Sequence, residues 1–276
     1  MKDSTALVKP KLSSAEKKII NLVLDALPSE NSRRAYQRVL EEFFFWHGEQ
    51  NRPELNKALI NRYIKTLRES GSSSSSINQK LSAIRKLASE AEDNDWIDSR
   101  IANGIRAVKG IPQRGRRTGN WLTRDEAQMW LNAPDVKTFK GLRDRALPGV
   151  LIGCGLRRAE AAILSFSHIK QREGRWAIVD IMGKRDKMRT VPMPSWAKSS
   201  VDAWKTAAHI EDGFVFRQVN KGDCVVGEGI TEQAIYNIIV GYADKLAAQG
   251  IAPHDLRRTF AKLAHKGGSI FRTNQF

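Results

Sequence analysis

Cysteine is scarce in this sequence, and long apolar runs are absent from it. The 276 residues contain two cysteines, Cys154 and Cys224, far apart and outside any Cys-x-x-Cys pattern. We interpret both as reduced packing residues of a cytoplasmic protein, with neither a disulfide framework nor a metal site. No stretch approaches about eighteen consecutive apolar residues, and the first residues lack the apolar segment of a signal peptide. We therefore expect neither secretion nor membrane spanning.

Acidic residues are also fewer than basic residues in this sequence. The chain has 46 Lys and Arg residues against 30 Asp and Glu residues, a net charge of +16, with an isoelectric point near 10.0. Residues 1–118 carry 22 basic and 14 acidic side chains, and residues 119–276 carry 24 and 16. Both halves therefore share the excess, which favours a polyanionic partner that contacts both. The alternative from charge alone is a basic protein without such a partner.

Apolar residues at helical spacing predict a helical first half. Five serines, Ser72 to Ser76, interrupt the pattern, and we interpret them as a loop rather than a domain boundary. Three amphipathic faces are visible, formed by Tyr36, Val39, Leu40, Phe43 and Phe44, by Leu55, Leu59, Tyr63 and Leu67, and by Ile77, Leu81, Ile84, Leu87 and Ala91.

A basic segment with glycines and a proline, within residues 106–121, predicts an interdomain linker. After it, Thr123 and Glu126 have the spacing of a capping box and predict the start of a helix. We therefore expect a flexible N-terminus over 1–14, a helical domain over 15–110, a linker over 111–121 and a second domain over 122–276.

The second domain is predicted to be mixed. Helical patterns lie near 141–153, 157–166, 195–208, 231–247 and 254–266. Between them, residues 176–182 and 189–193 read as two strands joined by a basic tip. The expected fold class is therefore mainly α, with a small β-hairpin or sheet in the second domain.

Three separated segments of this domain carry basic residues in chemically suggestive contexts. Arg157 is followed three residues later by Glu160, whose carboxylate can orient the guanidinium. Lys187 lies at the predicted hairpin tip, and His254 precedes Arg257 by three residues on a predicted helix. Together they could clamp one phosphate diester. Taken singly, an Arg-x-x-Glu pair is usually a surface ion pair, a hairpin lysine is usually a solvated tip, and a histidine at a helix start is often a cap.

The order of these motifs closely resembles the tyrosine recombinases, also called the phage integrase family. The matching segments are Gly-Leu-Arg-Arg-Ala-Glu (155–160), Gly-Lys-Arg-Asp-Lys-Met-Arg-Thr-Val-Pro-Met-Pro (183–194) and His-Asp-Leu-Arg-Arg-Thr-Phe-Ala (254–261). The resemblance covers roughly residues 15–268. It implies an all-helical, SAM-like core-binding domain and a mixed α+β catalytic domain of the DNA breaking-rejoining type, which clamp duplex DNA between them.

The resemblance also implies roles for individual residues. Arg157 and Arg257 would neutralise the non-bridging oxygens of the scissile phosphate, Lys187 would protonate the departing 5′ oxygen, His254 would assist, and Glu160 would brace Arg157. No metal or other cofactor is implied, and the partners would be duplex DNA and further recombinase subunits. The candidates for contacts to the DNA backbone are Arg33, Arg34, Lys80, Arg85 and Lys86 in the helical half and Arg114, Arg116 and Arg117 in the linker.

The sequence departs from the family at the nucleophile. The family's tyrosine follows the His-x-x-Arg helix, whereas Tyr36, Tyr63, Tyr236 and Tyr242 all precede His254, and we interpret none of them as the nucleophile. We therefore expect a chain truncated before that tyrosine, which binds DNA and does not cleave it alone. Three possibilities stay open: a site-specific recombinase of a bacterium or mobile element whose nucleophile is supplied in trans by a full-length partner, a non-catalytic DNA-binding regulator, and a decayed integrase fragment.

Overall fold

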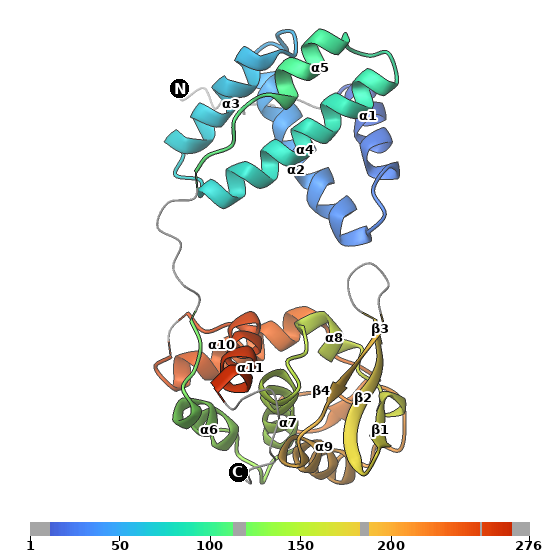
Figure 1. Cartoon of the computed structure of the whole chain (residues 1–276), viewed down its shortest axis with the longest axis vertical. Coiled ribbons are helices and arrows are strands. Elements are labelled where there is room, and N and C mark those ends of the chain that lie inside the picture. The colour runs from blue at the N-terminus through green and yellow to red at the C-terminus, as the bar shows by residue number, and fades with distance from the viewer. Residues whose placement is uncertain (1–11, 113–119, 183–187, 249, 267–276) are drawn as a thin grey trace, which may run out of the picture. The chain divides into compact units, whose positions relative to one another are not determined.

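The computed structural model describes residues 12–112, 120–182, 188–248 and 250–266. The chain divides into two units, Met1–Arg116 and Arg117–Phe276, and this division falls inside the basic segment expected to be the linker (Figure 1). Helices dominate both units, and the described strands are short and all belong to the second unit. The expected fold class is confirmed.

Each helix of the first unit begins at a polar side chain. Ser13, Ser29, Asn56, Ser73 and Asp98 accept hydrogen bonds from backbone N–H groups of the first turns, which have no partner within the helix. Three of the five consecutive serines therefore belong to a helix rather than to the expected loop. The elements are α1 (Ser14–Asp25), α2 (Glu30–Glu49), α3 (Lys57–Glu69), α4 (Ser74–Asp93) and α5 (Ser99–Arg106); the sequence pattern had indicated α2, α3 and α4 but not α1 and α5.

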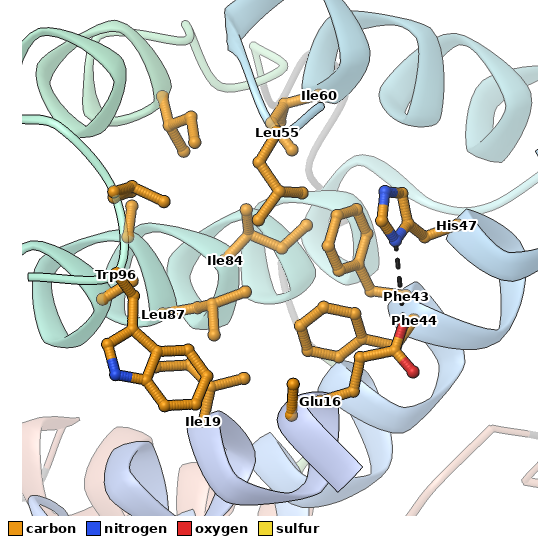
Figure 2. A pocket seen from close by; sticks show the side chains of 15 residues that line it. Glu16, Ile19, Phe43, Phe44, His47, Leu55, Ile60, Ile84, Leu87 and Trp96 are labelled. Carbon is orange, nitrogen blue, oxygen red and sulfur yellow. Dashed lines mark ion pairs between the residues drawn. The ribbon is translucent and has the colours of Figure 1, made fainter. Parts of the chain in front are cut away.

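Aromatic side chains fill the core of this unit. Phe43 contacts Tyr63 edge to face, with ring centroids 5.1 Å apart. Beside them lies a cavity of about 210 Å³, lined almost entirely by apolar side chains (Figure 2). At its polar end the Glu16 carboxylate lies 3.8 Å from His47 Nδ1 and 3.2 Å from Arg52 Nε. These polar groups hold α1 against the end of α2.

The chain leaving this unit is held against α4. The side-chain amide of Asn78 donates to the carbonyl of Ile111 at 2.9 Å and accepts from its N–H at 2.8 Å. Arg85 Nη2 donates to the carbonyl of Val108 at 2.5 Å. The start of the expected linker, at Ile111, is thus hydrogen-bonded to the helical unit.

The second unit begins with the expected capping box, in which Thr123 and Glu126 exchange hydrogen bonds. The helix expected over 157–166 is much shorter, because Leu164 and Ser165 leave the helix to pair with the segment around Phe214. The described helices of the second unit are α6 (Arg124–Asn132), α7 (Phe139–Gly153), α8 (Arg158–Ala162), α9 (Ser195–Ala207), α10 (Glu232–Lys245) and α11 (Pro253–Lys266), with a 3₁₀ turn, η1 (Phe166–His168).

The predicted hairpin is confirmed as β2 (Arg175–Met182) and β3 (Met188–Pro192), which pair antiparallel with Ile181 opposite Arg189. Its tip, residues 183–187, lies outside the described residues. A third strand, β1 (Ile169–Arg172), completes the order β1-β2-β3 and was missed because three of its four residues are exposed and polar. Two further short strands, β4 (Gln218–Val219) and β5 (Val225–Val226), form a separate ribbon.

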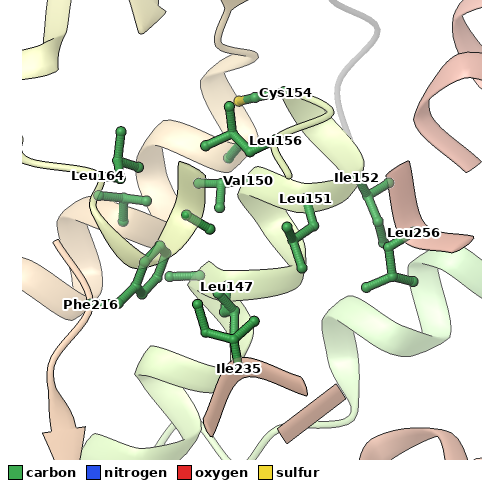
Figure 3. Close-up of a cluster of buried hydrophobic side chains, with 14 of the residues drawn as sticks. Leu147, Val150, Leu151, Ile152, Cys154, Leu156, Leu164, Phe216, Ile235 and Leu256 are labelled. Carbon is green, nitrogen blue, oxygen red and sulfur yellow. The ribbon is translucent and has the colours of Figure 1, made fainter. Parts of the chain in front are cut away.

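Helix α7 occupies the centre of the second unit's core (Figure 3). Leu147, Val150 and Leu151 are fully buried, as expected for the later part of α7, residues 146–153, which carries no charged side chain. Helices α6, α9 and α11 pack against it. Because α7 is enclosed, its C-terminal end, followed by the Gly-Leu-Arg motif, is held in a fixed place.

The two cysteines differ from each other in burial. Cys154, just after α7, is buried, and burial raises the pKa of its thiol, so it is an unreactive packing group. Cys224 is exposed, so the packing interpretation is wrong for it. Both thiols are free.

Candidate functional site

A tight turn at the end of α7 builds one side of the site. Gly155 has φ of +61°, and a Cβ at this position would lie 2.4 Å from the ring of Phe260 in α11. Glycine is therefore required both for the turn and for the close approach of α11. The Gly155 carbonyl accepts a hydrogen bond from Arg257 Nη1, so the turn and the arginine of α11 position each other.

One buried carboxylate organises the arginines around this turn. Glu160 is 6% exposed, and its Oε1 accepts from Arg157 Nη1 at 2.6 Å. Its Oε2 accepts from the backbone N–H of Arg157 and from Arg189 Nη2, both at 2.7 Å. Arg257 Nη1 lies 3.8 Å from the same Oε2. Three guanidinium groups, from the N-cap of α8, from β3 and from α11, thus surround a single carboxylate.

The balance of charge in this cluster is strongly positive. Burial alone would raise the pKa of Glu160, but hydrogen bonds from Arg157 and the charges of Arg189 and Arg157 hold it below its usual value. For Arg257, burial and then the charges of Arg157 and Arg189 lower the pKa, against the opposing effect of Glu160. An anion bound among these arginines would relieve their mutual repulsion.

A pocket of about 370 Å³ opens beside Arg157 and Arg257. His254, exposed at the start of α11, lines this pocket with them. Glu232 and Tyr236 of α10 contribute another part of the lining, where Arg158 Nε pairs with Glu232 at 3.3 Å and the Arg158 guanidinium lies 5.8 Å from the Tyr236 ring centroid. In this pocket Arg158 thus has a carboxylate of its own, whereas Arg157 and Arg257 share the single carboxylate of Glu160.

Arg157, Glu160 and Arg257, predicted from separate motifs, lie together, and His254 faces the same pocket. Arg157 is the N-cap of α8 rather than a residue within the helix as expected. Arg189 was missed, although it lies inside the segment 183–194 that matches the family. Its alternation within a strand did not distinguish it from an ordinary surface arginine. Four predicted residues lie outside the described residues, namely Lys187, Arg114, Arg116 and Arg117.

The basic residues proposed for the helical unit have partners within the unit. Arg33 Nε donates to the carbonyl of Leu27 at 2.9 Å, and Arg34, 72% exposed, pairs with Glu30 at 3.2 Å. Lys80, Arg85 and Lys86 are more strongly engaged: Lys80 pairs with Glu42 and its side chain is 12% exposed, Arg85 donates to Val108, and Lys86 lies 2.5 Å from Glu90. Arg33 and Arg34 keep the best access to a ligand among these five.

The four tyrosines lie in different environments. Tyr63 is buried in the helical core, and Tyr36 belongs to the same unit and is partly buried. Tyr242 donates to Asp144 Oδ2 at 3.3 Å, and burial followed by the nearby carboxylate raises the pKa of its phenol. Tyr236 lines the pocket. In the described part of the chain, no three or more His, Cys, Asp or Glu residues are grouped to hold a metal ion, and no helix is long and apolar enough to cross a membrane.

Both units of this chain are similar to known proteins. Residues 120–270 match the phage integrase family, and residues 21–94 match the N-terminal SAM-like domain of phage integrases. Tyrosine recombinase XerD of Pseudomonas aeruginosa is 28% identical over 279 residues, which cover 96% of this chain and 89% of that protein. Tyrosine recombinase XerC of Pelotomaculum thermopropionicum is 27% identical over 228 residues, covering 80% and 72%.

Solved structures share the fold at lower identity. The XerH recombinase in a post-cleavage complex with a palindromic difH substrate has a TM-score of 0.66 at 17% identity, covering 93% of this chain and 74% of that one. A lambda integrase dimer bound to a COC′ core site has a TM-score of 0.66 at 14% identity, covering 91% and 69%. Because the integrase match alone spans more than half of the sequence, this chain belongs to the phage integrase family of tyrosine recombinases.

Proposed function

We propose that this chain binds duplex DNA and holds one phosphodiester for site-specific recombination, together with further recombinase subunits. The observation that carries the proposal is the group of three arginines around Glu160, which leaves Arg157 and Arg257 beside an open pocket. Support for subunit assembly comes from the similar solved structures, which include a lambda integrase dimer on a core site and a tetramer on a Holliday junction. We place this activity in the cytoplasm, in keeping with two free cysteines.

The chemistry we propose is a transesterification, in which the phosphorus of a DNA phosphodiester is transferred from its 5′ oxygen to an attacking hydroxyl. Arg157 and Arg257 would donate to the non-bridging oxygens, where negative charge grows in the transition state. A new P–O bond would form to the attacking hydroxyl as the bond to the 5′ oxygen breaks. Lys187 would give that oxygen its proton, and His254, on the pocket wall, would hold the phosphate or accept the proton that the attacking hydroxyl loses.

The attacking hydroxyl, we propose, comes from outside the residues of this sequence or from another subunit. Tyr63 is enclosed in the helical unit, and Tyr242 is hydrogen-bonded to a buried carboxylate. Tyr236 lines the pocket, but its ring lies against Arg158, and Arg158 also pairs with the Glu232 carboxylate on the same wall. The chain alone should therefore bind DNA without forming a covalent link to it.

The test starts with selection of a preferred duplex from a randomised pool. A nicked form of this duplex is then incubated with the protein, and covalent adducts are resolved on a denaturing gel. We expect no adduct from the chain alone, and weaker duplex binding by Arg157→Gln and Arg257→Gln. An adduct that disappears in Tyr236→Phe would show that our assignment of the nucleophile is wrong, and unaltered binding by both arginine variants would refute the phosphate site.

Mixing distinguishes a recombinase from a regulator that only occupies the site. A full-length relative whose own Arg257 equivalent has been replaced is added to this chain on the nicked duplex. Cleavage that needs Arg157 and Arg257 of this chain would support an active phosphate site completed in trans. Inhibition of an intact relative, without any restored cleavage, would favour the non-catalytic DNA-binding regulator.

A further inference from the structure

Strand β3 brings into the cluster an arginine that the proposed function does not use. Arg189 lies opposite Ile181 of β2, and its Nη2 donates to Glu160 Oε2 at 2.7 Å. Its side chain is 33% exposed, and its Nε is buried without a hydrogen-bond partner among the described residues. The bond to Glu160 is the one ion pair that joins the sheet to α8 in the described part of the chain.

The second oxygen of Glu160 has no room for another donor. A carboxylate oxygen accepts two hydrogen bonds through its two lone pairs. Those of Oε2 are taken by the backbone N–H of Arg157 and by Arg189, both at 2.7 Å. Arg257 Nη1 stays at 3.8 Å, beyond hydrogen-bond distance, and donates to the Gly155 carbonyl instead.

We infer that Arg189 is a positioning residue that keeps Arg257 available to the DNA phosphate by occupying the oxygen of Glu160 that Arg257 would otherwise bind. Without Arg189, Oε2 gains a free lone pair only 3.8 Å from a guanidinium nitrogen. Arg257 then closes on Glu160 as a direct ion pair and withdraws from the pocket. The inference rests on the proposed function, since it assigns Arg257 to a phosphate.

The electrostatics act in the same direction as the hydrogen bonds. Arg189 and Arg157 both repel the Arg257 guanidinium, whereas Glu160 attracts it. Removal of Arg189 takes away one repulsion and leaves the attraction in place. Both effects move Arg257 toward Glu160. Loss of Arg189 therefore lowers the affinity for DNA, although Arg189 itself needs no contact with the DNA.

The experiment is a double-mutant cycle on duplex binding. Arg189→Gln, Arg257→Gln and the double variant are titrated with a labelled mixed-sequence duplex over a range of salt concentrations. We expect each single variant to weaken binding about tenfold, the size of one charge-assisted hydrogen bond, and the double variant to bind no more weakly than Arg257→Gln. The salt slope should fall by about 0.9 in Arg189→Gln, as expected when one phosphate is no longer neutralised.

Two further variants serve as controls. Arg175→Gln removes the same charge from an exposed position of the same sheet and should leave the salt slope nearly unchanged. Arg189→Lys keeps a donor and a positive charge near Oε2 and should restore most of the affinity for DNA. Urea unfolding shows whether Arg189→Gln is folded, and Arg189→Lys keeps the inference testable if it is not.

The outcomes separate the inference from the proposed function. If Arg257→Gln weakens binding while the Arg189 and Arg257 effects simply add, Arg189 acts independently and the inference is overturned. The same holds if Arg189→Gln behaves like Arg175→Gln. If Arg257→Gln leaves binding unchanged while Arg157→Gln weakens it, the inference is overturned. If both variants leave binding unchanged, the phosphate site is refuted, and with it the proposed function.

Discussion

Glu160 shows how a single acidic residue can organise a strongly basic site. It lies at the third position of the short helix α8, so its carboxylate reaches back to the N–H of the N-cap residue Arg157. The same carboxylate is close to guanidinium groups from three elements. Burial of this charge is tolerated because each oxygen accepts short, charge-assisted hydrogen bonds.

The pKa of Glu160 makes a prediction about stability and pH. Its pKa in the folded protein lies below the ordinary value of 4.5, so ionised Glu160 stabilises the fold fully above about that pH. The stabilisation is lost as the pH falls through the lower, folded-state pKa. The free energy of unfolding of wild type should therefore exceed that of Glu160→Gln at neutral pH, with the difference shrinking below pH 4.5. Urea unfolding at a series of pH values checks this; a constant difference would contradict it.

At the scale of elements, helix α7 determines where the site forms. It carries a buried ion pair, in which Arg143 Nη2 and Asp144 Oδ1 are 2.6 Å apart, with side chains 5% and 1% exposed. Asp144 also accepts from Tyr242 of α10, and Arg143 Nη1 donates to the carbonyl of Arg217 at 3.4 Å. These bonds tie α7 to its neighbours at the end opposite the Gly155 turn.

Breaking this pair should be costly. Asp144→Ala leaves the Arg143 guanidinium buried without its counter-ion, and we expect the free energy of unfolding to fall by about 3–5 kcal/mol. The matched control is Asp202→Ala, which breaks a pair between Lys198 and the half-exposed Asp202 in α9 and should cost less than about 1 kcal/mol. Urea unfolding followed by tryptophan fluorescence measures both. Equal losses would show that burial of the Arg143–Asp144 pair does not matter.

At the scale of the whole molecule, the positive charge is spread over both units but is not equally available. In the helical unit, Lys80 and Lys86 already pair with Glu42 and Glu90. In the second unit, the two positive charges of Arg157 and Arg257 exceed the single negative charge of Glu160 between them. Net charge therefore indicates a polyanionic partner without showing which cations contact it.

If both units contact one duplex, their contributions should add. Arg33→Gln with Arg34→Gln in the helical unit, and Arg157→Gln in the second, should each reduce the slope of log affinity against log salt by about 0.9 for every phosphate that the variant no longer neutralises. Combined, the reductions should sum, because the sites share no partner. Lys65→Gln is the control, since Lys65 pairs with Glu69 in the same unit and is not among the candidates for DNA contacts. If the combined variant reduces the salt slope no further than either set alone, one unit does not contact the duplex.

Much of the architecture could be predicted from periodicity and capping residues. The faces of α2, α3 and α4, the Thr123–Glu126 capping box and the β2–β3 hairpin all follow from local spacing. Strand β1 was missed because an edge strand with exposed polar residues has no apolar alternation. Helix α8 ended early because a tertiary pairing with the segment around Phe214 replaced its last turns.

The sequence by itself determined the net charge, the helical character of both units and the order of the motifs that place this chain among the tyrosine recombinases. Only the tertiary structure decided that Arg189 joins Arg157 and Arg257 at Glu160, and that Lys80 and Arg85 are engaged within their own unit. The physical reason is distance along the chain. Arg189 and Glu160 are 29 positions apart in the sequence, and Arg257 and Gly155 are 102 positions apart. They meet because β3 and α11 lie beside α8 and the turn after α7, and local spacing does not predict this packing.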